Sequence, residues 1–215
     1  MTTPSGAPGA RRVPLQQRSR ERLERILEAA ASLFVERGYD VTTMENIAER
    51  AQTSIGSVYQ FYPNKRAMFD AMAERYIELA RELFEELLVS NARIERWDTM
   101  LDRSIDTFAA FERSGVIVRA VWLNWQMSPE FLIAGEALNR EFARRCEAFL
   151  AEHAKDLPAA RRLLVATMIV EHISAMMIVN VRRDDDLGRA VLEETKILLR
   201  RYLRPYLGPP TKRRR

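Results

Sequence analysis

This chain of 215 residues has little chemistry based on sulfur or imidazole, because it contains one cysteine and two histidines. A single thiol cannot form an internal disulfide, and Cys146 with only His153 and His172 beside it cannot build a Cys/His zinc site. We therefore expect no bound metal and a reducing compartment, the cytoplasm. Glycine and proline number only 8 and 9, strand-like alternation is scarce, and Ala, Leu, Glu and Arg dominate. These features predict an all-α fold.

Catalytic patterns are also missing. The sequence has no phosphate-binding glycine loop and no HExxH or GxSxG pattern. Glu171 and His172 are neighbours on an expected helix, so they point in different directions and do not form a dyad. We predict a protein that is not an enzyme and needs no cofactor. The first residues lack the apolar core of a secretory signal or a membrane anchor.

The net charge of +4 is concentrated at the two ends of the chain. Residues 1–20 carry four arginines (Arg11, Arg12, Arg18 and Arg20) and no acid, and the last four residues are KRRR. Without these cations the rest of the chain is net acidic. We expect residues 1–15, rich in Gly, Pro, Ser and Thr, to be a disordered basic arm that attracts phosphate. Residues 208–215 are expected to be a solvated basic tail.

Residues 42–62 contain two short helical patterns separated by a polar turn. The first places Ile47, Ala48 and Ala51 on one stripe, and the second buries Ile55, Val58 and Phe61 or Tyr62 before Pro63 ends it. Two short helices joined by such a turn are typical of a helix-turn-helix. A longer pattern that ends at Arg37 and Gly38 supplies an apolar surface for both.

The start of the first short helix and the outward face of the second carry polar groups. Thr42 with Glu45 and Thr43 with Asn46 both fit a capping box, and the sequence does not choose between them. Outward positions of the second helix are Gly56, Ser57, Tyr59 and Gln60. They combine little bulk with no acid, which suits close approach to a polyanion. For each residue taken alone, capping, packing or solvation is an equally good explanation.

The run GYDVTTMENIAERAQTSIGSVYQFYPNKRAMFDAM resembles the N-terminal DNA-binding domain of TetR-family transcriptional regulators. The resemblance implies phosphate contacts from Thr43, Tyr59 and Lys65. It implies that a second set of residues faces the major groove, namely Thr53, Ser54, Gly56, Ser57 and Gln60. The chain departs from the family where a glycine usually follows the alanine of the turn, because Gln52 stands there. Gln52 has to accept a tight turn that can be left-handed.

The remaining sequence predicts a helical body. Helical patterns cover 65–90, 94–113, 116–126, 128–153, 163–181 and 187–207, with Asn64 and Ser128 as caps. The predicted fold is therefore all-α, with an N-terminal three-helix DNA-binding domain (16–64) followed by a larger helical ligand-binding and dimerisation domain (65–207), about nine helices. By resemblance, the long helix that begins at Lys65 transmits movements of the body to the spacing of two recognition helices.

Aromatic residues are concentrated in this body, and for most of them the core is the better explanation. Some are candidates to line a pocket for an apolar effector, and the first choices are Phe108, Trp122, Trp125 and Met127. Asn124, Gln126 and His172 are candidate polar groups for orientation. Met176 and Met177 suit either the floor of the pocket or an adaptable interface.

The segment 163–181, LLVATMIVEHISAMMIVNV, is the most apolar in the chain. Glu171, His172 and Asn180 argue against a membrane span, so a helix that packs on its own subunit and on a partner fits better. Asp184, Asp185 and Asp186 are expected to cap the final helix rather than to bind a metal. That helix would supply the second half of a four-helix dimer interface.

These patterns predict a homodimeric one-component regulator, by family habit a repressor. It would bind a pseudo-palindromic operator in double-stranded DNA and be released by a small hydrophobic effector. The alternative is a helical protein-interaction module without sequence-specific DNA binding, in which the helix-turn-helix serves only packing.

Overall fold

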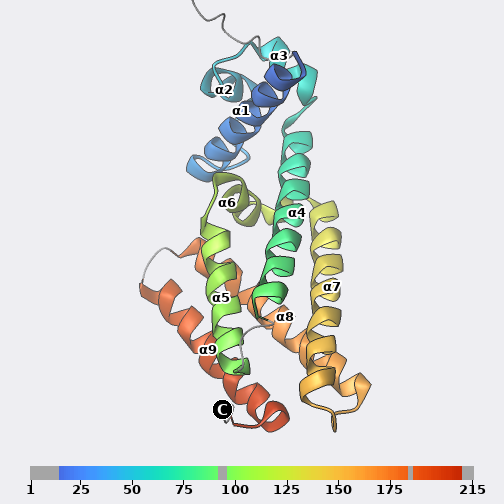
Figure 1. Ribbon diagram of the computed structural model, residues 1–215. Helices are drawn as coiled ribbons and strands as arrows, with labels where there is room; N and C mark the ends of the chain where they lie inside the picture. Colours follow the sequence, from blue (N-terminus) through green and yellow to red (C-terminus); the bar gives the residue numbers. More distant parts are fainter. Residues whose placement is uncertain (1–14, 92–95, 184–185, 210–215) are drawn as a thin grey trace, which may run out of the picture.

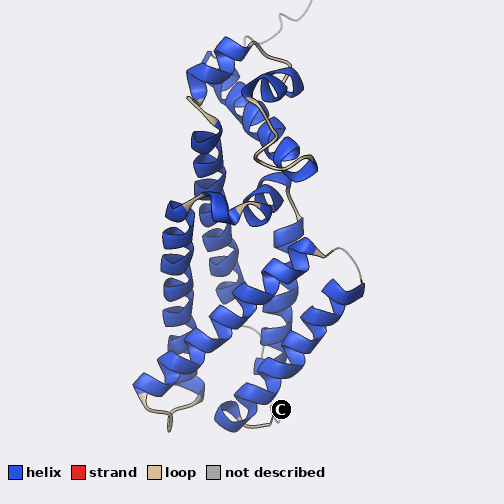
Figure 2. Cartoon of the chain, turned by 180° about the vertical axis from the view of Figure 1, so that it is seen from behind, coloured by secondary structure: helices blue, strands red, loops and turns tan. Residues whose placement is uncertain are grey.

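The computed structural model describes residues 15–91, 96–183 and 186–209, and the regular elements in this part of the chain are all helices joined by loops and turns (Figures 1 and 2). Residues 1–14 of the expected arm (1–15), the tail residues 210–215 and the expected caps Asp184 and Asp185 lie outside the described residues, and Leu15 is the first residue of helix α1. The elements are α1 (Leu15–Glu36), α2 (Met44–Arg50), α3 (Ile55–Phe61), α4 (Lys65–Asn91), α5 (Trp97–Arg113), α6 (Val116–Leu123), a 3-10 turn η1 (Trp125–Met127), α7 (Pro129–His153), α8 (Ala159–Arg182) and α9 (Asp186–Leu207). The all-α prediction is confirmed.

Helices α1 to α3 form the end of the molecule at the top of Figure 1. Their core unites Ile26 and Phe34 of α1 with Ile47 of α2 and Val58 of α3, all 0–1% exposed. Because α2 and α3 have only seven residues each, they depend on this packing for stability. The apolar stripes found in the sequence therefore predict most of the packing at this end. Ile55 is the exception: the sequence pattern predicts that it is buried, but it is 37% exposed, because it is the first residue of α3 and the inner side of this helix is formed by Val58 and Tyr62.

The two threonines before α2 have different roles. Thr43 caps the helix: its hydroxyl accepts from the Asn46 amide at 3.2 Å, and the Asn46 side chain accepts from the Thr43 amide at 3.3 Å. Thr42 is buried, and its hydroxyl donates to the Gly38 carbonyl at 2.8 Å. Gly38 has a φ of +94° that ends α1. The capping box is thus the Thr43–Asn46 pair.

Gln52 takes a left-handed conformation, with φ of 52°. It is the only non-glycine residue with positive φ in the described part of the chain. The turn it makes lies between α2 and α3, and its amide donates to the Glu49 carbonyl at 3.1 Å. The tight turn expected at this departure from the family pattern is therefore present.

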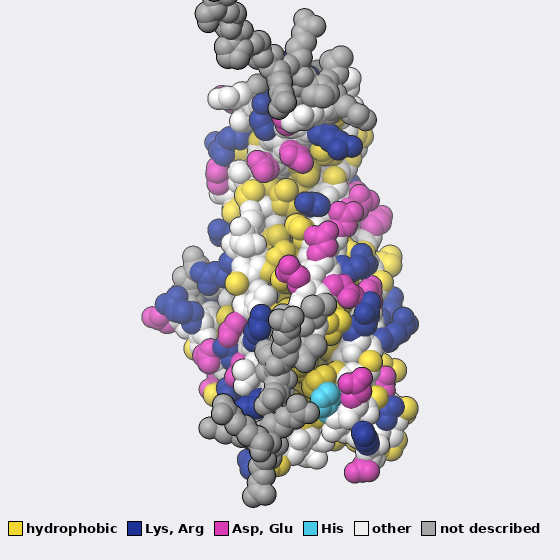
Figure 3. All heavy atoms as spheres, in the orientation of Figure 1, with side chains coloured by type: hydrophobic (Ala, Val, Ile, Leu, Met, Phe, Trp, Pro, Cys, Tyr) yellow, Lys and Arg dark blue, Asp and Glu magenta, His cyan; other side chains and the backbone are white. Residues whose placement is uncertain are grey.

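Helix α4 connects the three-helix end to the helical body, which consists of α4 to α9. It runs past α6 and packs along α5 and α7 (Figure 1). Helix α6 packs on α1 as well as on α4. Both α4 and α6 therefore connect the three-helix end to the helical body. From behind, α8 and α9 cross the body next to one another (Figure 2). On the face in Figure 3, side chains of both charge signs are interspersed along the body, which therefore offers no single-sign surface there.

Helix α8 is long and apolar enough to cross a membrane by length and composition alone. One side packs on α7, α9 and α5 and buries Val165, Ile169 and Met177. The other side leaves Leu164 and Met168 48% and 50% exposed. The helix therefore has one packed face and one apolar face that no other helix in the described part of the chain covers.

Candidate DNA interface and ligand cavity

Helix α3 is held so that its polar side faces outward. Ser54 caps it, since the Ser54 hydroxyl accepts from the Ser57 amide at 3.2 Å and donates to the Ser57 hydroxyl at 3.0 Å. Val58 and Tyr62 anchor the inner side at 0% and 7% exposure. Tyr59 and Gln60 consequently point into solvent. The structure brings Ser54, Ser57, Tyr59 and Gln60 together on one short helix, as the sequence predicts.

Gly56 lies on this exposed side and has no structural reason to be glycine. A Cβ atom built on it meets nothing within 4 Å, and its backbone is not left-handed. A glycine in a helix is destabilising relative to alanine. The packing of the described residues therefore does not require a glycine at this position.

The other predicted DNA contacts flank α3. Thr43 is exposed at the start of α2, and Thr53 is half-buried in the turn, where its amide donates to the Ala48 carbonyl at 3.0 Å. Asn64 caps α4 as expected, because its side chain accepts from the Ala67 amide at 2.9 Å. The start of α4 lies beside these residues, and the first backbone N–H groups of a helix have no partner within that helix.

Lys65 is more constrained than the sequence suggests. Its ammonium donates to the carbonyls of Tyr39 and Asp40 at 2.6 and 3.1 Å, and lies 4.6 Å from the centre of the Tyr39 ring. The side chain therefore ties the start of α4 to the loop between α1 and α2. Any phosphate contact falls to the remaining N–H of this ammonium and to the backbone at the helix start.

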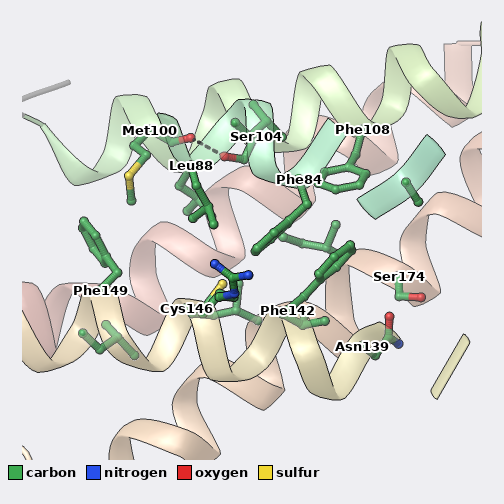
Figure 4. A pocket seen from close by; sticks show the side chains of 18 of the residues that line it. Phe84, Leu88, Met100, Ser104, Phe108, Asn139, Phe142, Cys146, Phe149 and Ser174 are labelled. Carbon is green, nitrogen blue, oxygen red and sulfur yellow. Dashed lines mark hydrogen bonds between the residues drawn. The ribbon is translucent and has the colours of Figure 1, made fainter. Parts of the chain in front are cut away.

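The body encloses a cavity of about 550 Å³ between α4, α5, α7 and α8 (Figure 4). Phe84, Phe108 and Phe142 come together in it from three helices, and the Phe84 and Phe142 rings stack at 3.9 Å. Cys146 lines it too, and burial raises the pKa of this thiol to about 12, so it stays protonated and unreactive. The cavity is apolar with few polar groups, as expected of a ligand site.

Only part of the predicted ligand set lines this cavity. Phe108 and Trp122 do. Trp125 packs against the core from η1, while His172 and Met176 lie on other sides of α8, where Met177 faces the cavity instead. The side chain of Met127 lies outside the described residues.

The candidate polar groups are likewise not the ones expected. The Asn124 amide donates to its own helix at the Ala120 carbonyl, 2.8 Å away, and Gln126 is exposed. Lining polar groups instead include Asn139, Ser174 and Glu112. The candidate polar groups for a ligand are therefore Asn139, Ser174 and Glu112, in place of Asn124, Gln126 and His172.

Glu112 is the main residue that sequence reasoning missed. It is 1% exposed, and its Oε1 accepts from the Tyr76 hydroxyl at 2.9 Å. Burial raises the pKa of this carboxyl to about 8, against smaller lowering effects of the Tyr76 hydroxyl and the Trp122 indole. One signal could have found it: Glu112 continues the stripe of Leu101, Ile105 and Phe108 at helical spacing.

Helix α4 contacts both the cavity and the three-helix end. Its Tyr76 hydroxyl donates to Glu112 in the cavity, and six residues earlier Asp70 accepts from the Ser128 hydroxyl at 2.9 Å and from Arg66 at 3.0 Å. Lys65 at the start of the helix holds the loop after α1. Trp122 of α6 also lines the cavity, and α6 packs on α1. The cavity therefore touches both elements that join the two parts.

The fold and site define a helix-turn-helix DNA-binding protein with a cavity in an attached helical body. A family model described as bacterial regulatory proteins, tetR family, matches residues 26–72, and one described as tetracyclin repressor-like, C-terminal domain, matches residues 97–203. Both models describe regulators rather than enzymes. The chain belongs to the TetR family of transcriptional regulators.

Individual relatives agree with this assignment. A TetR-family regulator from Streptomyces coelicolor is 30% identical, with a TM-score of 0.56, over 86% of this chain and 99% of that one. The repressor KstR of Mycolicibacterium smegmatis is 39% identical over 46 residues, 21% of this chain and 22% of KstR. AibR, solved with isovaleryl coenzyme A and operator DNA, shares the fold at 18% identity and a TM-score of 0.60, over 83% of this chain and 97% of that one. The matches cover between 20% and 42% of the length of these curated relatives.

Proposed function

We propose that this regulator is a cytoplasmic repressor that binds a pseudo-palindromic operator as a homodimer and is released when a small, largely apolar molecule fills the cavity of the body. The observation that carries the DNA-binding part is the outward face of α3. It combines exposed Tyr59 and Gln60 with Gly56, whose missing side chain the fold itself does not require. A Gln amide can pair with adenine through two hydrogen bonds, and a bare backbone permits close approach.

Dimerisation is supported by the unpartnered apolar face of α8 and α9. Leu164 and Met168 on α8, with Leu198 on α9, are each about half exposed. Large exposed apolar side chains clustered on two adjacent helices mark an interaction surface. Two copies that join through these helices would form a four-helix interface, with one α3 in each half-site of the operator.

Release by a ligand follows from what lines the cavity. Tyr76 belongs to α4 and Trp122 to α6, and these two helices connect the body to α1 to α3. A ligand that shifts either helix changes the tilt of α3 relative to its dimer mate. Half-sites lie about 34 Å apart, so a small tilt is enough to lose one of them. The name of KstR supports repression as the mode.

The test compares two substitutions on α3 in binding to a DNA fragment from upstream of the chain's own gene. Tyr59→Ala should weaken binding to all sequences alike, because a phosphate contact carries no sequence information. Gln60→Ala should relax preference at one base pair, by about 1–3 kcal/mol of discrimination. If both variants weaken binding uniformly, Gln60 does not read a base. Retention of full affinity in both would favour a helical interaction module, in which α3 only packs.

A further inference from the structure

One end of the cavity contains an acid that has no counter-ion. Glu112 is buried, its Oε1 is occupied by the Tyr76 hydroxyl, and its Oε2 has no hydrogen-bond partner. No Lys or Arg in the described part of the chain forms an ion pair with it. A buried carboxyl is costly unless it is paired or protonated. Its unused oxygen belongs to a residue that lines the cavity.

The Tyr76 side chain that holds this carboxyl packs among aromatic rings. The Tyr76 ring centre lies 5.8 Å from those of Trp122 and Phe111, and 5.7 Å from that of Phe131. Of these residues, Tyr76 and Trp122 line the cavity. The Trp122 indole lowers the pKa of the same carboxyl, but its N–H makes no hydrogen bond. Aromatic faces attract cations, and most strongly where water is excluded. A buried acid beside the Tyr76 and Trp122 rings is therefore suited to a positively charged group.

The cavity is elongated, with the acid at one end. Tyr76, Ala80, Phe84 and Leu88 line it from α4 at successive helical turns, a run of about 18 Å at 1.5 Å per residue. Glu112 faces Tyr76, and Phe108 lies near Phe84 with ring centres 6.4 Å apart. Toward the far end Leu88, Met100 and Phe149 line the cavity (Figure 4), and the exposed Glu152 and His153 follow on α7. An occupant that matches this profile places a polar head at the buried Glu112 and an apolar body along the aromatic and aliphatic walls.

We propose that this end of the cavity binds the protonated amine of an elongated, otherwise apolar molecule, with the Glu112 carboxylate as its counter-ion. This assignment rests on the proposed function of the cavity as an effector site, and it names the chemical class of the effector. The amine donates to the unpartnered Oε2, and the aromatic rings surround its charge. Neutral and anionic molecules of the same shape leave the buried acid unpaired.

The raised pKa of Glu112 allows a bound cation to convert the acid into its carboxylate near neutral pH. Its pKa of about 8 leaves the acid form favoured only about tenfold at pH 7, and one adjacent positive charge lowers a carboxyl pKa by about 1–3 units. Few other titratable groups face it. Tyr76 of α4 has a pKa raised well above 10 by burial, and Arg145 of α7, further along the cavity, pairs with Glu85 at 2.7 Å. Trp122 of α6 and Asn180 of α8 do not titrate.

The experiment is titration calorimetry of the full chain with three probes of one chain length, decylamine, decanol and decanoate, below their aggregation concentrations. Decylamine should bind at least about tenfold more tightly than decanol near pH 7. Its affinity should rise up to about tenfold per pH unit from about pH 6 toward 8, with a proton released that shows as a buffer-dependent heat. Decanoate should bind more weakly than decanol.

Two variants separate this charge effect from general packing. Glu112→Gln keeps the shape of the side chain, and should lose the preference for decylamine while binding decanol as before. Glu152→Gln, which removes another cavity carboxyl, should keep the preference. Equal binding of decylamine and decanol, or a preference that survives Glu112→Gln, would overturn the assignment but leave an apolar effector site intact. Binding of none of the three probes would contradict the effector site itself.

Discussion

Replacing Gly56 by alanine should separate the stability of this protein from its DNA binding. A Cβ at this position meets no atom within 4 Å, so the substitution creates no clash. Alanine in a helix is favoured over glycine by up to about 1 kcal/mol, and for a chain of this size that corresponds to a rise of about 2–4 °C in Tm. DNA affinity should nevertheless fall at least about tenfold, or about 1.4 kcal/mol, because the new methyl group occupies the closest approach to the groove.

Gly135 provides the matched control. It lies inside α7, and a Cβ there also meets nothing within 4 Å. Gly135→Ala should therefore raise Tm similarly and leave operator binding unchanged. Thermal unfolding followed by circular dichroism gives the first quantity, and fluorescence anisotropy of a labelled operator fragment gives the second. If Gly56→Ala binds DNA as tightly as Gly135→Ala, α3 does not approach DNA through this backbone.

Three further substitutions test other parts of the structure. Gln52→Gly should raise the unfolding free energy in a denaturant titration by up to about 1 kcal/mol, because Gln52 has a left-handed φ of 52°. Burial raises the pKa of Glu112 from 4.5 to about 8, so the folded state keeps a proton that the unfolded chain loses. Stability from this group is complete below about pH 4.5 and falls by up to about 1.4 kcal/mol per unit as pH rises toward 8. The Glu112→Gln variant has no carboxyl at this position and therefore does not lose stability in this way. The Tm of the variant minus the Tm of the native chain should increase between about pH 5 and 8. A difference that stays constant with pH would contradict the raised pKa of Glu112. Met168→Asp, at a half-exposed position of α8, should give monomers by light scattering and weaken operator binding; an unchanged dimer would place the interface elsewhere.

The sequence predicts the DNA-binding end well because its signals are local. The apolar stripes of α2 and α3 identify the residues that pack inward, except for Ile55 at the exposed start of α3, and the outward residues follow from them. What it does not decide is the choice between Thr42 and Thr43 as the cap of α2. That choice depends on the Gly38 carbonyl, which becomes available to the Thr42 hydroxyl only once α1 has ended in a left-handed turn.

The cavity is less predictable because its signals are not local. Helix α8 is apolar on nearly all sides, so periodicity does not show that Met177 rather than Met176 faces inward. Its rotation is set by packing against several helices at once. Trp122 and Trp125 are close in sequence but separated by the end of α6, which turns only Trp122 into the cavity. Glu112 resembles a solvated residue in the last turn of a helix until α4 and α6 cover it.

The central claim, that α3 binds DNA, is tested most directly by the salt dependence of binding. The full chain would be titrated against a fragment from upstream of its own gene over a range of salt concentrations. Contacts to phosphates release counterions, so the logarithm of the binding constant should fall linearly with the logarithm of salt concentration, by about 0.9 for each phosphate neutralised. Tyr59→Ala should lower affinity at every salt concentration. Absence of binding at low salt, or binding that does not change with salt, would contradict the claim.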